Sequence, residues 1–224
     1  MGRHLERREG TMIKTHKKLL IVTSIIILLP TVAGLILWDR LPQEVPTHWG
    51  FNGQPDDYAS REVAVFLLPL LMLAVQWLCV LAETFATKNK HQNPKLLGLV
   101  LWICPLISTV CMTGVYAWAL GYTFPVERVI IPVLGILFCI IGNYMPKCRP
   151  NRTMGIRIPW TMLNEATWVA AHRLTGWIWT LGGILILPCA LLPHPYLFWC
   201  FLGIVLVMTL VPIVYSAIHY YRNR

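Results

Sequence analysis

Long apolar runs separated by short charged segments constrain this chain more than any other feature. Six runs are long enough to cross a hydrocarbon core about 30 Å thick as helices. They cover residues 19–38, 63–82, 96–120, 127–145, 174–192 and 196–217. None contains Lys or Arg away from its ends, which suits an apolar solvent. The sequence therefore predicts an all-α integral membrane protein with six transmembrane helices.

The distribution of basic residues predicts the orientation of these spans. With a cytoplasmic amino terminus, the inside segments hold sixteen of the nineteen Lys and Arg residues, and only Arg40, Arg61 and Arg128 lie outside. The positive-inside rule then places both termini in the cytoplasm. The predicted topology and contact with anionic lipid head groups explain the net charge of +9. We therefore expect membrane lipids as partners and no direct binding of nucleic acid. A hydrophobic content of 56% and a mean hydropathy of +0.59 are too apolar for a typical soluble domain.

We expect the chain to fold as one helical bundle, and its sequence divides into three parts. They are a basic cytoplasmic segment at 1–18, an amino-terminal domain at 19–95 with an outer loop at 39–62, and a region at 96–224 with an inner loop at 146–173. Residues 7–12 have the composition that purine-rich codons of a ribosome-binding site would encode. We therefore predict that residues 1–11 precede the true start at Met12.

Chemical motifs are sparse. A helix at 162–173, capped by Thr161, would place Glu165, Trp168 and His172 on one stripe, but no activated nucleophile can be placed beside them. The seven cysteines form no Cys-x-x-Cys pair and no tight cluster with histidine, which disfavours a zinc site. We expect no catalytic residues, no metal, no cofactor and no enzyme activity. Span interiors lack ionisable groups, which disfavours an ion-coupled transporter but leaves open a small carrier or channel for a lipid or peptide.

Two segments carry more sequence information than a helical bundle needs. The outer loop has three prolines and two glycines, which exclude a continuous helix and predict a series of turns, with its aromatic rings at head-group depth. Its candidate binding residues are His48, Trp49, Gly53 and Asp56. The inner loop and its flanks supply a second set, for docking a partner or for structure: Asn143, Asn151, Arg157, Trp160, Asn164, Trp168, His172 and Arg173.

These segments also carry a resemblance. The outer loop, with Leu41-Pro42, Val45-Pro46, His48-Trp49, Gly53 and Pro55-Asp56, resembles the loop of a small bacterial membrane domain of unknown function at the front of SdpI-type proteins. The signature of the SdpI family is similar to the run Gly142-Asn143-Tyr144-Met145-Pro146-Lys147 followed by Asn151, Gly155-Ile156-Arg157, Pro159-Trp160-Thr161, Trp168, His172-Arg173 and Gly176. Together the two matches reach from the first span through the fifth.

The resemblance implies a multi-pass immunity protein of the bacterial plasma membrane. Such a protein protects its cell from a secreted, membrane-active toxin peptide of the SdpC type. In the best-known kind of member, the toxin-occupied protein also sequesters a cytoplasmic ArsR-like autorepressor, which implies signal transduction through the same molecule. The residues of the two loops are compatible with this model: the acidic, aromatic outer loop offers a surface for an amphipathic peptide, and the basic inner loop offers a docking face for a soluble partner.

Overall fold

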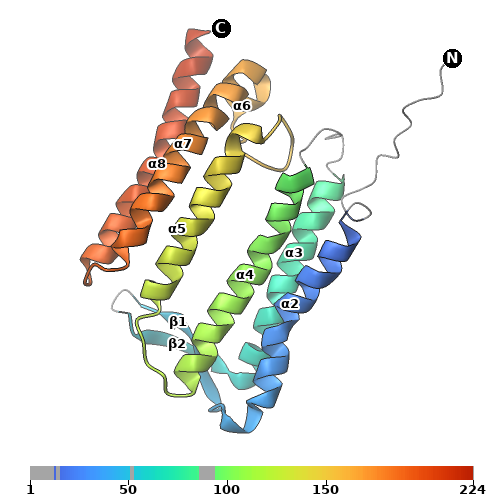
Figure 1. The fold of residues 1–224 in the computed structure, drawn as a ribbon, viewed down its shortest axis with the longest axis vertical. Coiled ribbons are helices and arrows are strands. Elements are labelled where there is room, and N and C mark those ends of the chain that lie inside the picture. Colours follow the sequence, from blue (N-terminus) through green and yellow to red (C-terminus); the bar gives the residue numbers. More distant parts are fainter. Residues whose placement is uncertain (1–12, 14–15, 51–52, 86–93, 224) are drawn as a thin grey trace, which may run out of the picture.

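The protein is mostly helical, and its long helices run along the long axis of the molecule (Figure 1). The computed structural model describes residues 13, 16–50, 53–85 and 94–223. The predicted extension at 1–11 lies outside the described residues. The helices are α2 (Lys17–Ile36), α3 (Leu68–Phe85), α4 (Pro94–Ala119), α5 (Glu127–Tyr144), α6 (Pro159–Leu163), α7 (Glu165–Cys189) and α8 (Tyr196–Arg222).

Five described helical segments are long and apolar enough to cross a membrane, so the chain is a multi-pass membrane protein. They are Lys17–Ile36, Val63–Thr84, Gly98–Ala119, Glu127–Lys147 and Tyr196–Arg222. Each falls on one of the six predicted spans. The helix over the remaining span, 174–192, is α7, which is as long but less apolar because it carries Gly, Thr and Trp residues. The sixth span and the cytoplasmic termini therefore remain predictions.

The helices form two halves that contact each other little. In the first half, α2 packs on α3 and α4; in the second, α7 packs on α5 and α8. Backbones of α5 and α7 approach so closely that a Cβ atom on Gly183 would lie 2.5 Å from the Gly135 carbonyl oxygen. Small residues permit such contacts between helices in membranes, where the hydrophobic effect does not drive association.

The outer loop folds into a β-hairpin, which corrects the expectation of an all-α chain with only turns between the first two spans. Strand β1 (Glu44–Trp49) pairs with antiparallel β2 (Pro55–Ser60), and Gly53 adopts a φ of +72° in the connection. Prolines are compatible with this hairpin because each strand has an outer edge that needs no donor. Val45 is fully buried and anchors the hairpin in an apolar cluster with Leu41, Ala64, Val65, Met112, Val115 and Tyr116.

The hairpin and the inner loop lie at opposite ends of the bundle (Figure 1). The start of α2, the end of α8 and the segment between α5 and α7 share one end, whereas the hairpin lies near the end of α4 and the start of α5. This arrangement places the two predicted sites at separate ends of the molecule.

Candidate functional site

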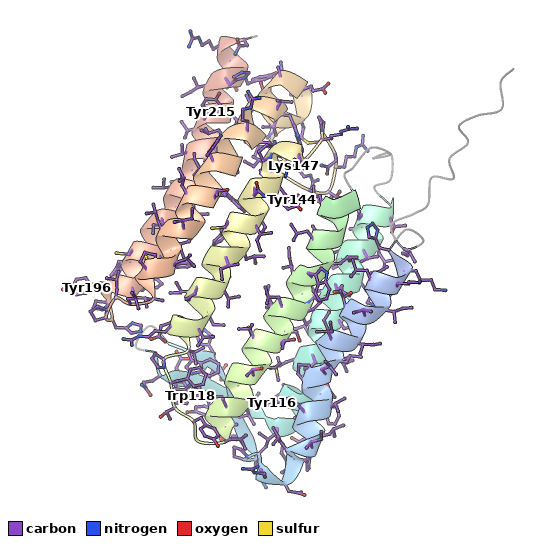
Figure 2. The ribbon with its side chains drawn as sticks, viewed as in Figure 1. Tyr116, Trp118, Tyr144, Lys147, Tyr196 and Tyr215 are labelled. Carbon is purple, nitrogen blue, oxygen red and sulfur yellow. The ribbon has the colours of Figure 1, made fainter. Side chains whose placement is uncertain are left out.

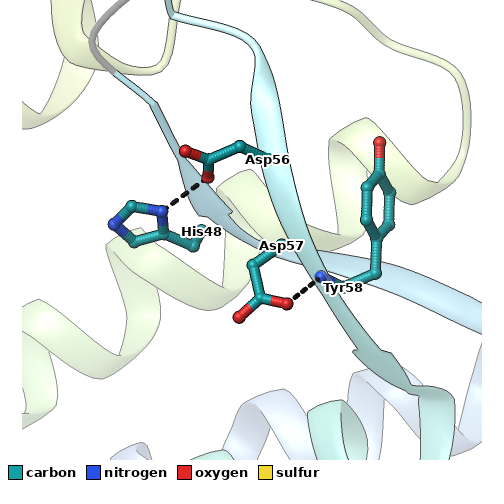
Figure 3. Close-up of polar contacts among 4 residues, drawn as sticks. All are labelled: His48, Asp56, Asp57 and Tyr58. Atoms are coloured by element: carbon teal, nitrogen blue, oxygen red, sulfur yellow. Dashed lines mark hydrogen bonds and ion pairs between the residues drawn. The ribbon is translucent and has the colours of Figure 1, made fainter.

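The hairpin presents one ion pair at its surface. His48 Nδ1 lies 2.6 Å from Asp56 Oδ1, across the two strands (Figure 3). Both side chains are largely exposed, with relative exposures of 68% and 51%. An exposed pair of this kind contributes at most about 1 kcal/mol to stability. The pair is therefore better placed to contact another molecule than to hold the fold together.

A second pair of the same chemistry comes from the other half of the protein. His194, in the connection between α7 and α8, donates from Nε2 to Glu127 Oε1 at the start of α5 over 2.8 Å. These side chains are less exposed, at 33% and 17%. A Cβ atom on Gly53 would lie 3.3 Å from both Glu127 Oε2 and His194 Nε2, so the tip of the hairpin approaches this pair closely.

Both pairs line one pocket of about 390 Å³, which we call the outer pocket. The hairpin contributes His48, Trp49, Gly50, Gly53 and Asp56; the second half contributes Val126, Glu127, Ile130, Ile131, Leu134, His194, Leu197, Phe198 and Phe201. The two ion pairs are the more exposed part of the lining, which we call the rim, and the apolar side chains, with Ile131 and Leu197 buried, form the floor. No Ser, Thr, Cys or Lys occurs among the described lining residues. Such a pocket can bind a ligand with one charged or polar end and one apolar part.

Trp49 connects the outer pocket to a larger apolar groove. This lateral groove, of about 770 Å³, runs between α3, α4 and α5 and shares His48, Trp49, Val126 and Ile130 with the outer pocket. Trp49 packs edge-on against Trp118, with ring centroids 6.2 Å apart, near the end of α4 (Figure 2). Its indole N–H has no hydrogen-bond acceptor among the described residues. A ligand carbonyl would satisfy this donor, since an unpaired buried donor costs about 1–3 kcal/mol.

Asn151 organises the inner loop from within. It is only 4% exposed, and its Oδ1 accepts from the backbone N–H groups of Thr153 and Met154 over 2.8 and 2.6 Å. Its Nδ2 donates to the carbonyl oxygen of Arg149 over 2.8 Å. One side chain therefore satisfies three backbone groups of a turn. This residue is not available on the surface for docking.

Trp168 and His172 hold the inner loop against α7. Trp168 donates from Nε1 to the carbonyl oxygen of Cys148 over 2.9 Å, and its ring stacks on His172 with centroids 4.0 Å apart. His172 Nε2 accepts from the Ile156 N–H over 3.1 Å, which requires the proton on Nδ1, where it is donated to the Trp168 carbonyl oxygen. Gly155 has a φ of +99°, and any Cβ there would collide with His172.

Cys148 shares the buried environment of this loop. It is 6% exposed, and burial raises the pKa of its thiol to about 11. The Asn151 side chain opposes this shift by a hydrogen bond. The thiol is therefore neutral near pH 7 and packs as a small apolar group.

The helix predicted at 162–173 does lead into the fifth predicted span, but its predicted start is wrong, because α7 begins at Glu165. Pro159 begins α6, because proline suits the first turn of a helix, and Thr161 does not cap a helix that follows it. The Thr161 hydroxyl instead donates to the Ile156 carbonyl oxygen over 2.7 Å. Asn164 caps α7 by accepting from the Thr167 N–H over 2.9 Å, and α7 then continues unbroken to Cys189.

The stripe of Glu165, Trp168 and His172 is not an open face. Glu165 is exposed, whereas the relative exposures of Trp168 and His172 are each 1%. Trp160 is half-buried because its Nε1 donates to the buried Ser216 hydroxyl over 2.9 Å. Of the predicted inner residues, only Asn143, Arg157 and Arg173 are exposed.

Sequence reasoning missed Glu127 and His194. Both fall in segments that the predicted topology puts on the outer side, together with His48 and Asp56. That shared side was a usable signal, since the outer ends of all spans meet at one surface. The predicted topology could not show which polar side chains on the outer side lie within hydrogen-bonding distance of each other.

The bundle and its two ends define a class: a small helical, multi-pass membrane protein with a hairpin-covered pocket at one end and a hydrogen-bonded loop at the other. Residues 25–73 match a domain of unknown function (DUF1648), and residues 147–216 match the SdpI/YfhL protein family. These matches, together with the similarity to an SdpI protein given next, support the SdpI family for this chain.

Two relatives show how far the similarity extends. The immunity protein SdpI of Bacillus subtilis (strain 168) is 27% identical over 206 residues, which cover 91% of this chain and 96% of that protein. An uncharacterized protein of Archaeoglobus fulgidus is 33% identical over 78 residues, covering 34% of this chain and 43% of that protein. No solved structure matches the chain.

Proposed function

We propose that this chain is an immunity protein of the bacterial plasma membrane that binds a secreted, membrane-active peptide toxin of the SdpC type at the outer pocket. The observation that carries the proposal is the pocket itself, in which two histidine–carboxylate pairs from different halves surround an apolar floor. An amphipathic peptide offers both chemistries at once. Similarity to an immunity protein along nearly the whole chain supports the same function.

The proposal includes six spans and cytoplasmic termini. At 25 residues, α7 is about 37 Å long, enough to cross the hydrocarbon core. It packs between α5 and α8, which are themselves long and apolar enough to span. Its Gly and Thr residues face close neighbours rather than lipid: Gly183 lies against α5, and the Thr180 hydroxyl bonds back to the Gly176 carbonyl oxygen.

A signalling role is part of the proposal for the inner end. A cytoplasmic ArsR-like repressor would need accessible groups. Asn143, Arg157 and Arg173 are the exposed members of the predicted set, and Trp160 is half-buried. The buried members would act indirectly, by giving these groups a fixed framework.

We favour binding over catalysis for the outer pocket, because its described lining has no Ser, Thr, Cys or Lys beside its histidines and carboxylates. The lateral groove supports a second candidate, a carrier for a lipid or peptide, because it offers an apolar path beside the outer pocket. Release of a fluorescent lipid or dye from vesicles containing the purified protein separates the candidates. An immunity receptor leaves the leak rate unchanged.

The test of the first candidate is survival. A toxin-sensitive bacterium without its own immunity protein expresses the wild-type chain, Glu127→Gln or His194→Ala and is challenged with SdpC-type peptide. We expect protection by the wild type and at least about a tenfold lower tolerated dose for either variant, because a charged hydrogen bond contributes about 1.5–3 kcal/mol.

Glu62→Gln is the matched control, because Glu62 is an exposed carboxylate at the same end that does not line the outer pocket. It should protect like the wild type. Killing of cells that hold normal membrane levels of the wild-type chain would reject this toxin class.

A further inference from the structure

A separate pocket lies at the opposite end of the molecule. It has a volume of about 350 Å³ and lies between α4 of the first half and α5, α7 and the inner loop of the second. Its lining is almost wholly apolar: Leu96, Leu99, Val100, Ile103, Ile141, Met145, Cys148, Met154, Gly155, Ile156 and Trp179. The neutral Cys148 thiol adds no charge to it. The size is typical of a small-molecule site rather than of a packing defect.

The loop that contributes Cys148, Met154, Gly155 and Ile156 to this inner pocket is rich in basic residues. Residues 146–164 contain Lys147, Arg149, Arg152 and Arg157 and no acidic residue. Arg157 directly follows the lining residue Ile156 in the sequence. Arg152 and Arg157 are exposed and form no ion pair with any residue that the structure describes. Lys147 instead lies over the Tyr144 ring, 4.6 Å from its centroid (Figure 2).

We propose that the inner pocket binds an anionic phospholipid, with an acyl chain between α4 and α5 and its phosphate at Arg152 and Arg157. An apolar lining in a loop that also carries unpaired cations complements a lipid, since basic pockets between transmembrane helices bind anionic head groups. The pocket also lies where the two halves of the protein contact each other little, so the bound acyl chain would contact both halves. This site is independent of the toxin proposal.

The experiment is a lipid titration of the purified full chain in detergent, followed by native mass spectrometry, with phosphatidylglycerol and phosphatidylcholine of identical acyl chains. We expect tighter binding of phosphatidylglycerol. Arg152→Gln with Arg157→Gln should weaken it about 25-fold, about 5-fold for each arginine. Val100→Phe, which fills the pocket from α4, should abolish binding.

Two controls decide whether a site is responsible. Arg222→Gln removes a basic residue at the end of α8, which contributes nothing to the described pocket lining, and it should leave the affinity unchanged. Soluble glycerol phosphate should not displace the lipid, because it lacks the acyl chain. Equal loss in Arg222→Gln would indicate diffuse surface charge, and displacement by glycerol phosphate would indicate a phosphate site only; either result overturns the proposal.

The thermal transition in phosphatidylcholine shows whether Val100→Phe folds, and Ile103→Phe repeats the test from the next turn of α4 if it does not. Equal affinity for the two lipids, or unchanged binding in a folded variant with a filled pocket, also overturns the proposal. In the latter case the lipid binds elsewhere on the protein.

Discussion

The hairpin end and the inner-loop end use similar residue types in opposite ways. At the hairpin end, His48 and Asp56 are exposed and support little of the fold. At the inner end, Asn151 and His172 are buried and satisfy backbone groups that would otherwise lie unpaired. Polar residues in a membrane-protein loop therefore have two distinct uses, and burial tells them apart. The predictions that follow test this difference by the cost of each change to stability.

Gly155→Ala should have the largest effect. A φ of +99° costs an alanine about 1–2 kcal/mol, and its Cβ would also displace His172 from the Ile156 N–H. We expect a total loss of about 3–4 kcal/mol in the free energy of unfolding, measured in mixed micelles.

Gly121→Ala separates the two causes, because Gly121 has a φ of +89° and nothing within 4 Å of an added Cβ. It should cost only the conformational part, about 1–2 kcal/mol. Equal losses in the two variants would mean that the contact between Gly155 and His172 contributes nothing.

Asn151→Ala should come next, with a loss of about 2–3 kcal/mol. It leaves the partly buried N–H groups of Thr153 and Met154 without their acceptor. Asn143→Ala is the counterpart on an exposed amide and should change the free energy of unfolding by less than about 0.5 kcal/mol. The same unfolding measurement compares them, and a larger loss at Asn143 would reverse the assignment of structural and surface roles.

His48→Ala should have only a small effect on stability, about 0–1 kcal/mol, because its ion pair is exposed. Protection against the toxin should nevertheless fall, since His48 lies on the rim of the outer pocket. Growth under toxin and membrane abundance are measured together. Asp57→Asn is the control, because Asp57 bonds to the Tyr58 N–H beside it and does not line the pocket (Figure 3). Full protection by His48→Ala would remove the histidine from the binding site.

Sequence patterns predicted the helices well because they depend on local composition. Each of the six predicted spans falls on an observed helix, and α5 lies within one residue of its predicted end. The hairpin was missed because prolines and glycines exclude a helix without specifying which strands pair. The cap of α7 was assigned to Thr161 rather than to Asn164, because both residue types suit that position and only the path of the chain distinguishes them.

Family resemblance identified the candidate residues but could not assign their roles. A family signature shows that a residue type recurs among members but not why. Trp168 would belong to the signature whether it docked a partner or donated a hydrogen bond to the Cys148 carbonyl oxygen. The structure distinguishes these because it gives burial and partners. The same limit explains why Glu127 and His194, which belong to no recognised motif in this chain, were overlooked.

By itself, the sequence determined the solvent in which this chain folds, the positions of its apolar helices and the end that carries its positive charge. Hydrophobicity and charge act through the surroundings of each segment, so they can be read along the chain. Only the tertiary structure decided that Gly53 meets Glu127 and His194 at the outer pocket, and that Asn151 and His172 are buried at the inner end. These contacts join residues far apart in the sequence, and their formation depends on how the helices pack.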